Sequence, residues 1–175
     1  MAIISKKICL VGDFGVGKTS LIRRFVERQF SDQYLSTVGV KISKKTVDLS
    51  SPESGDTLNL QLMIWDLEGH TKFKAIAPSY LQGASGGIIV ADVTRKDTIE
   101  RIPEHVNLFF SVNPKGVVII ALNKSDLVDE EKLDKLAQMV PSFKPEQIIA
   151  QYQTSAKTGL YVDEMFQKLS NKIIA

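Results

Sequence analysis

The chain has 175 residues, which is enough for one well-packed domain and too few for two domains of typical size. Hydrophobic residues make up 43% of it, no apolar run approaches the ~20 residues of a membrane-spanning helix, and its one cysteine excludes an internal disulfide. A net charge of +2, from 22 basic and 20 acidic residues scattered along the chain, gives no indication of nucleic-acid binding.

Short apolar runs alternate with longer amphipathic stretches, which predicts a single α/β domain over residues 1–175 with a mostly parallel sheet and helices on both faces. The predicted strands cover residues 7–11, 41–49, 58–66, 87–92, 117–123 and 148–153. A polar segment with turn residues joins the second strand to the third, so we expect an antiparallel hairpin at the edge of the sheet. The predicted helices cover residues 19–29, 98–112, 130–139 and 162–174, with a short irregular one within 72–81. Pro103 is expected to disturb the first half of the helix at 98–112.

Residues 12–19 read GDFGVGKT and fit the phosphate-loop pattern G-x-x-x-x-G-K-[ST] between a predicted strand and a predicted helix. The glycines let successive backbone N–H groups converge on phosphate oxygens, and the helix N-terminus adds a favourable dipole. Lys18 is expected to bridge the β- and γ-phosphates of a nucleotide, and Thr19 to place its hydroxyl on Mg²⁺. The alternative is a glycine-rich turn with a solvated lysine, which the flanking elements disfavour. The predicted phosphate-side residues are Asp13, Phe14, Gly15, Val16, Gly17, Lys18, Thr19 and Ser20.

Three further polar signals follow predicted strands, where ligands collect in an open parallel sheet. Asp66 and Gly69 form an Asp-x-x-Gly pattern, in which the carboxylate suits water-mediated Mg²⁺ binding and the glycine lets an N–H approach the γ-phosphate. Alone, this pattern is weak, because it arises often in ordinary turns. The other two signals are Asn-Lys-Ser-Asp at 123–126 and Thr-Ser-Ala-Lys at 154–157.

Together these motifs resemble, in order and over essentially the whole chain, the small GTPases of the Ras superfamily, and the Rab branch most closely. The resemblance implies a P-loop NTPase fold with a six-stranded, mostly parallel sheet. It also implies a guanine-nucleotide switch that binds GTP or GDP with Mg²⁺ and hydrolyses GTP. Switch loops near residues 31–42 and 67–81 would report the nucleotide state to a protein partner.

The resemblance also assigns roles to single residues. Thr37, otherwise an ordinary loop threonine, joins Thr19 and Asp66 as a magnesium ligand. Asp126 accepts from the ring N–H and exocyclic amine of guanine, and the Ala156 N–H donates to the guanine carbonyl; adenine would leave the carboxylate unpaired. The implied catalytic residues are Lys18, Thr37, Gly69 and His70. The other implied nucleotide contacts are Phe30, Tyr34, Asn123, Lys124, Ser155 and Lys157, with Asn123 bracing the loops and Phe30 packing against the base.

The chain departs from the family pattern beside the γ-phosphate. His70 replaces the glutamine that orients the attacking water, and Phe14 stands where a small residue is usual. Leu67 and Glu68 replace the usual Thr-Ala. Because phosphoryl transfer depends on positioning and charge stabilisation, we expect slow hydrolysis and resistance to activators that insert an arginine.

Three alternatives stay open at this point. His70 could orient the water through its own imidazole. The protein could be a hydrolysis-deficient scaffold that holds GTP or GDP for structural integrity, although Mg²⁺ and γ-phosphate ligands would then be needless. An ATP-dependent kinase is the third alternative, and it is disfavoured because Asn-Lys-Ser-Asp reads guanine.

The expected partners are guanine nucleotide, a protein effector, and an exchange factor or activating protein, the proteins acting through the switch regions. Rab effectors commonly dock on an aromatic trio; Trp65 and Tyr80 match two members, but Ile42 replaces the third. The sequence shows no signal-peptide core, no glycine for myristoylation and no cysteine near its C-terminal end for prenylation. We therefore expect a cytoplasmic monomer with no lipid anchor in this chain.

Overall fold

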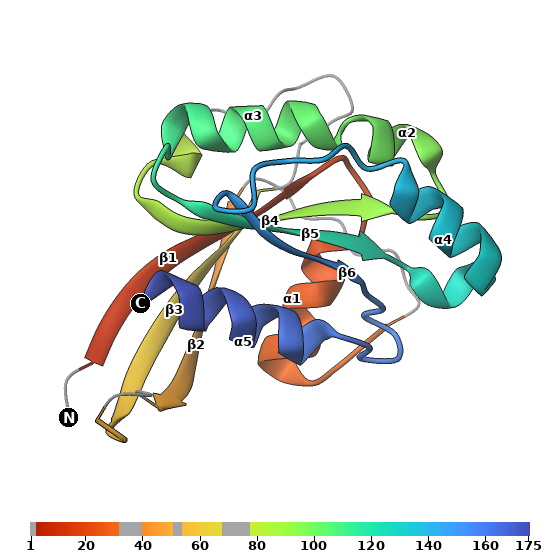
Figure 1. The fold of residues 1–175 in the computed structure, drawn as a ribbon. Helices are drawn as coiled ribbons and strands as arrows, with labels where there is room; N and C mark the ends of the chain where they lie inside the picture. The colour runs from red at the N-terminus through yellow and green to blue at the C-terminus, as the bar shows by residue number, and fades with distance from the viewer. Residues whose placement is uncertain (1–2, 32–39, 51–53, 68–77) are drawn as a thin grey trace.

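The computed structural model describes residues 3–31, 40–50, 54–67 and 78–175 (Figure 1). Its centre is a six-stranded sheet in the order β2-β3-β1-β4-β5-β6. Strands β2 and β3 pair antiparallel at one edge, and the other neighbours are parallel. The strands span Ile3–Gly12 (β1), Val40–Ser50 (β2), Thr57–Leu67 (β3), Ala84–Asp92 (β4), Val117–Asn123 (β5) and Ile148–Gln153 (β6). The predicted mostly parallel sheet with one antiparallel edge hairpin is thus confirmed.

Helices cover both faces of the sheet (Figure 1). They span Lys18–Glu27 (α1), Lys96–Glu100 (α2), Ile102–Val112 (α3), Glu130–Gln138 (α4) and Val162–Ile173 (α5), with 3-10 turns at Pro78–Leu81 (η1) and Ser125–Leu127 (η2). The helix predicted over 98–112, with a disturbance in its first half, is two helices that meet at Arg101. Pro103 lies in the first turn of α3, where its missing N–H leaves no helical hydrogen bond unmade. In the described part of the chain, no helix is long and apolar enough to cross a membrane.

The strand β1 shows why both faces are covered. Ile8 and Leu10 belong to the core cluster that α1 and α5 complete, whereas Cys9 and Val11 belong to the cluster that α3 completes. All four side chains are fully buried. Because successive side chains of a strand point to opposite faces, an uninterrupted apolar run requires a helical layer on each side.

The carboxyl ends of the parallel strands, β3 among them, lie at one edge of the sheet and carry the loops that form the candidate site. Residues 32–39 and 68–77, which hold most of the two predicted switch loops, lie outside the described residues. Of the irregular helix predicted within 72–81, the described part is the 3-10 turn Pro78–Leu81.

Candidate functional site

The loop between β1 and α1 wraps closely against its neighbours, and two of its glycines have no room for a side chain. A Cβ on Gly17 would lie 2.3 Å from Nδ2 of Asn123, and the residue has a left-handed φ of 101°. A Cβ on Gly12 would lie 2.3 Å from the backbone oxygen of Val90. The loop can therefore approach both a ligand and the adjacent strands by backbone alone.

Lys18 turns its ammonium group back into this loop. Its Nζ donates to the carbonyl oxygens of Gly12 at 3.0 Å and Asp13 at 2.9 Å, and the residue is only 1% exposed. A cation buried this deeply requires compensating negative charge, which carbonyl dipoles supply in part and an anionic phosphate would supply more fully. The residues predicted to bind phosphate, 13–20, all lie in this loop or in the first turn of α1.

Two of the three predicted magnesium ligands lie in contact. The Thr19 hydroxyl donates to Oδ2 of Asp66 at 2.5 Å, and Asp66 is 1% exposed at the end of β3. A hydroxyl and a carboxylate oxygen are the donors that Mg²⁺ accepts, so this pair fits the implied metal. Five predicted residues of the switch loops lie outside the described residues: Tyr34, Thr37, Glu68, Gly69 and His70.

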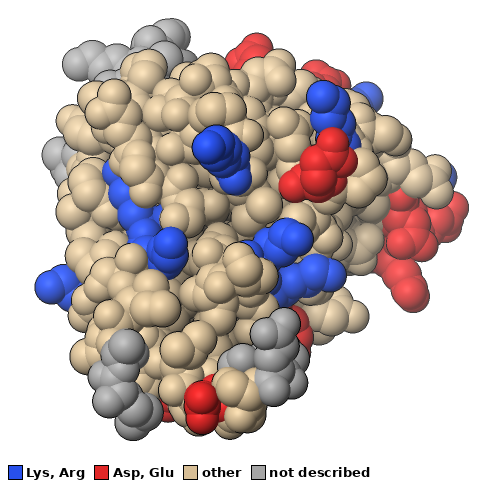
Figure 2. Space-filling view, turned by 60° about the vertical axis from the view of Figure 1, so that its left-hand side comes forward, with Lys and Arg blue, Asp and Glu red and all other residues tan. Residues whose placement is uncertain are grey.

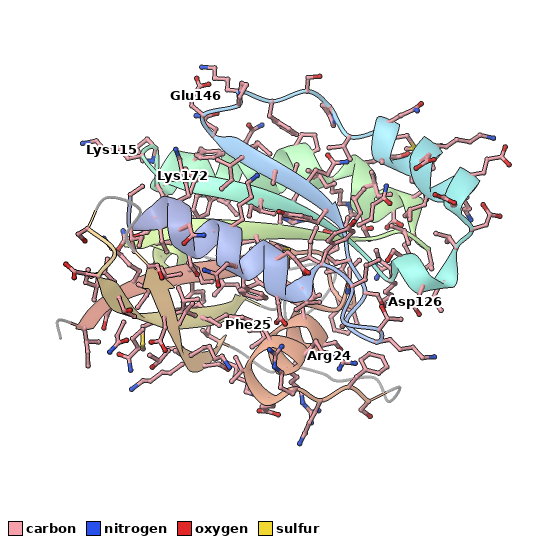
Figure 3. The ribbon with its side chains drawn as sticks, turned by 60° about the horizontal axis from the view of Figure 1, so that its bottom comes forward. Arg24, Phe25, Lys115, Asp126, Glu146 and Lys172 are labelled. Atoms are coloured by element: carbon pink, nitrogen blue, oxygen red, sulfur yellow. The ribbon has the colours of Figure 1, made fainter. Side chains whose placement is uncertain are left out.

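Two loops carry the residues that are expected to read the base, 123–126 and 154–157, and we call them the base-side loops; three side-chain hydrogen bonds join them to each other and to the phosphate loop. Nδ2 of Asn123 donates to the carbonyl of Val16 at 3.0 Å, and its Oδ1 accepts from the Thr154 hydroxyl at 3.1 Å. The Ser155 hydroxyl donates to Oδ1 of Asp126 at 2.7 Å. Asn123, Thr154 and Ser155 are buried, whereas Asp126, which is labelled in Figure 3, is exposed. This arrangement fixes an accessible carboxylate on a buried polar support.

Lys124 links the base side to the phosphate side. Its Nζ donates to the Gly15 carbonyl at 3.0 Å and lies 2.9 Å from Oδ2 of Asp92, a residue that sequence reasoning did not single out.

Ala156 is 4% exposed and packs in the core cluster with α1 and α5. Phe30 packs against the same cluster, and its contact with a base stays a prediction.

A basic cluster around the phosphate loop was also missed. Nε2 of His105 lies 2.9 Å from Oδ1 of Asp13, NH1 of Arg101 lies 3.3 Å from Oδ2, and Arg95 donates to the Phe14 carbonyl at 2.7 Å. Burial by itself would raise the pKa of the Asp13 carboxyl. The hydrogen bond and charge of His105, with the charges of Arg101 and Arg95, outweigh burial and hold that pKa below its usual value. The signal in the sequence was the i, i+4 spacing of Arg101 and His105 within the helix predicted over 98–112.

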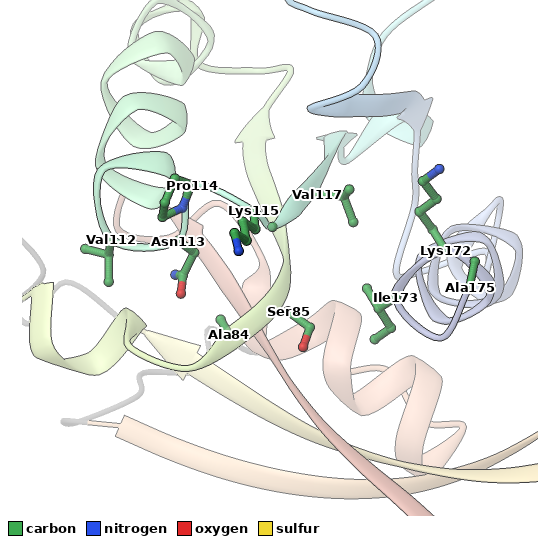
Figure 4. A pocket seen from close by; sticks show the side chains of 11 residues that line it. Ala84, Ser85, Val112, Asn113, Pro114, Lys115, Val117, Lys172, Ile173 and Ala175 are labelled. Carbon is green, nitrogen blue, oxygen red and sulfur yellow. The ribbon is translucent and has the colours of Figure 1, made fainter.

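A pocket lies at the opposite end of the sheet (Figure 4). Ala84 and Val117, at the starts of β4 and β5, contribute to its wall, as does Ile173 at the end of α5. Ligands of open parallel sheets collect at the carboxyl ends of the strands. We therefore place the candidate site at the phosphate loop and not in this pocket.

The Ras family model matches residues 7–175 of the chain. The chain belongs to the Ras family. Among Rab relatives, Rab-13 of Bos taurus is 36% identical over 174 residues, covering 96% of this chain and 79% of that protein. Rab-1C of Dictyostelium discoideum is 37% identical over 169 residues (95% and 80%), and human Rab-22A is 32% identical over 174 residues (99% and 86%). Ras-family proteins are GTP-binding switches that use Mg²⁺ and bind protein effectors and regulators, and the likeness to Rab proteins supports a GTPase of this kind.

The residues at the Rab aromatic-trio positions come together on the surface of this Ras-family chain. Ile42 pairs across strands with Trp65, and Ile42 and Tyr80 are 46% and 39% exposed. Nζ of Lys7 lies 3.7 Å from the centre of the Trp65 ring and donates to the Tyr80 carbonyl at 2.8 Å. Lys7 thus connects the Trp65 ring to the backbone of Tyr80. Figure 2 shows that on the face it presents, basic side chains lie singly or in small groups among uncharged ones.

Proposed function

We propose that the protein is a single G domain that binds GTP and GDP with Mg²⁺, hydrolyses GTP slowly and signals its nucleotide state to a protein partner. The observation that carries this proposal is the direct bonding between the phosphate loop and the base-side loops. Asn123 holds the Val16 carbonyl, and Lys124 holds the Gly15 carbonyl. One ligand with an anionic end and a planar polar end would contact both groups of loops.

Guanine is the base that this site would select. Asp126 is an exposed acceptor held by the Ser155 hydroxyl at 2.7 Å, so its carboxylate is oriented before a ligand arrives. Guanine presents two adjacent N–H groups to such an acceptor, whereas adenine presents none on that edge. Sites that rely on bonds of this kind reject the analogue that lacks them by about 10⁴ or more.

The described residues also support a role in hydrolysis. Bound Mg²⁺ would neutralise charge on the phosphate oxygens. Lys18 would stabilise the charge that develops as water attacks the γ-phosphorus and the bond to the β–γ bridging oxygen breaks, releasing GDP and phosphate. The contact between the Thr19 hydroxyl and the Asp66 carboxylate supports the metal assignment, because both are oxygen groups that Mg²⁺ accepts.

The slow rate is assigned to Phe14, Glu68 and His70. The side chain of Phe14 is 36% exposed on the phosphate loop, where it would obstruct an inserted arginine. Leu67 has no part in this assignment, since its side chain is 1% exposed and packs in the core cluster with Val11 and Leu81. The leucine at position 67 therefore differs from the family pattern because it packs in the core.

The base assignment is tested with Asp126→Asn. An amide in place of the carboxylate donates where guanine also donates, so the preference should move from guanine to xanthine nucleotides, which carry a carbonyl there. Asp129→Asn is the matched control, because Asp129 caps α4 by accepting from Lys132 N at 2.8 Å and asparagine caps equally well. Unchanged guanine preference in Asp126→Asn would contradict the assignment.

Single-turnover GTP hydrolysis tests the slow-rate proposal. We expect His70→Ala to match wild type and His70→Gln to hydrolyse about tenfold faster, equivalent to ~1.4 kcal/mol of barrier. A slower His70→Ala variant would show instead that the imidazole orients water. Tight GTP binding with no turnover by wild type would favour the hydrolysis-deficient scaffold.

A further inference from the structure

We propose that Arg24 is a positioning residue for base recognition, holding the loop after β6 against the helix that starts in the phosphate loop. This inference rests on the proposed function, because it assigns the source of guanine selectivity to a residue outside the nucleotide-binding motifs. Nε of Arg24 donates to the Ala156 carbonyl at 2.7 Å, and NH2 donates to the Lys157 carbonyl. One guanidinium therefore bridges two consecutive peptide units.

The bridge acts on the residue that is expected to read the base. The N–H of Ala156 is the proposed donor to the guanine carbonyl oxygen, and the carbonyl of the same residue accepts from Arg24. Fixing that carbonyl restricts rotation about the backbone bonds of Ala156. This restriction limits the directions in which the N–H of Ala156, in the preceding peptide unit, can point. A planar guanidinium suits this task, since its donors lie in a fixed fork.

The surroundings of Arg24 make the bridge rigid. The next residue of α1, Phe25, stacks on Phe166 of α5 with ring centres 4.0 Å apart and an interplanar angle of 4°. One turn further, Arg28 lies 2.6 Å from Asp163 at the start of α5. Figure 3 shows Arg24 and Phe25 on α1, with Asp126 farther to the right on another segment. Helix α1 is thus attached both to the loop after β6 and to the helix that follows that loop.

The same helix begins at Lys18, which belongs to the phosphate side of the site. Arg24 lies six positions after Lys18, a rise of about 9 Å along a helix. Within the loop, the Ser155 hydroxyl accepts from the Thr158 N–H at 3.1 Å and donates to the Asp126 carboxylate. Because Ala156 follows Ser155 directly, an ordered Ala156 also helps to hold Ser155 against that carboxylate. Helix α1 therefore sets the spacing between the phosphate cradle and the base-reading groups.

The test compares Arg24→Ala with Arg23→Ala. Arg23 is the adjacent residue of α1, and its side-chain partners are Glu27 at 3.3 Å, the last residue of the helix, and Gln29 at 3.2 Å, just beyond it. For each variant, the affinities for GDP and for ADP are measured with Mg²⁺ by competition against a fluorescent guanine nucleotide. ADP serves as the probe of the phosphate cradle, because it shares the diphosphate and lacks the guanine edge.

We expect Arg24→Ala to bind GDP about tenfold more weakly while its ADP affinity stays within twofold of wild type. Arg24→Lys should recover part of the loss, since an ammonium keeps the charge but does not bridge two carbonyls in a fixed fork. Arg23→Ala should match wild type for both nucleotides. Equal weakening of GDP and ADP would show that Arg24 merely stabilises α1 and would overturn the inference, as would unchanged GDP binding. A wild-type protein that binds GDP and ADP equally would refute the proposed function itself, which is a separate result.

Discussion

Replacing Asn123 by alanine should destabilise the protein strongly, because this side chain satisfies two buried groups at once. Its Nδ2 donates to the Val16 carbonyl at 3.0 Å and its Oδ1 accepts from the Thr154 hydroxyl at 3.1 Å. Val16 and Thr154 are both 0% exposed, so water does not readily replace the lost partner. Leaving a buried polar group unsatisfied costs about 1–3 kcal/mol.

Two such groups give an expected loss of about 3 kcal/mol in the free energy of unfolding, after partial relaxation of the loop. For a chain of this size that corresponds to a fall of roughly 6–12 °C in Tm. Urea unfolding of the GDP-bound protein measures the difference. Asn107→Ala is the matched control, since Asn107 lies on the exposed face of α3 and should change stability by no more than ~0.5 kcal/mol.

Asn123→Asp separates the two bonds. It keeps an acceptor for Thr154 but places a carboxylate oxygen against the Val16 carbonyl, so it should be at least as destabilising as Asn123→Ala. If Asn123→Ala and Asn107→Ala unfolded at the same urea concentration, the bracing role of Asn123 would be refuted.

Three further predictions concern other parts of the molecule. Gly17→Ala should weaken GDP binding at least tenfold, because its Cβ would lie 2.3 Å from Nδ2 of Asn123 at a left-handed φ; equal affinity in a binding titration would contradict the close packing. The lowered pKa of Asp13 adds stability that is present above the unfolded-state pKa of about 3.9 and lost as the pH falls through the folded-state pKa. The urea midpoint of wild type should therefore exceed that of Asp13→Asn at pH 6 and approach it below about pH 4, and a constant gap would argue against a charged network with His105. Burial raises the pKa of the Cys9 thiol to about 12, with the Lys7 charge opposing, so a disulfide reagent at pH 8 should modify the folded protein about a hundredfold or more slowly than the unfolded chain.

The sheet was predictable because its central strands are continuous apolar runs; the limits predicted for β5 and β6 match the structure. Strand β1 begins four residues earlier than predicted, since Ile3 to Lys6 alternate exposed and half-buried side chains and lack an apolar run. Their place in the sheet comes from parallel pairing with β3, beginning at Ile3 and Asn59. A segment of this kind is specified by its neighbour and not by its own composition.

The candidate site likewise has a part that the local sequence predicts and a part that depends on residues distant in the chain. The phosphate loop and the residues proposed to read the base stand in contiguous motifs, and the predicted strands before them indicated from sequence alone that both lie at the carboxyl edge of the sheet. Arg24 was missed because its acceptors are backbone carbonyls 132 and 133 positions away, and every residue carries such a carbonyl. The contact of His105 with Asp13 spans 92 positions and depends on how α3 packs against β1. Contacts of this type have no sequence signature until the fold is known.

The central claim is that the loops around Asp126 and Ala156 choose guanine for the phosphate loop at Lys18. The most direct measurement is the affinity of nucleotide-free wild-type protein for GDP and ADP, each with and without Mg²⁺. We expect GDP to bind about 10⁴-fold or more tightly than ADP, with Mg²⁺ strengthening both. Equal affinities for the two nucleotides would contradict the claim.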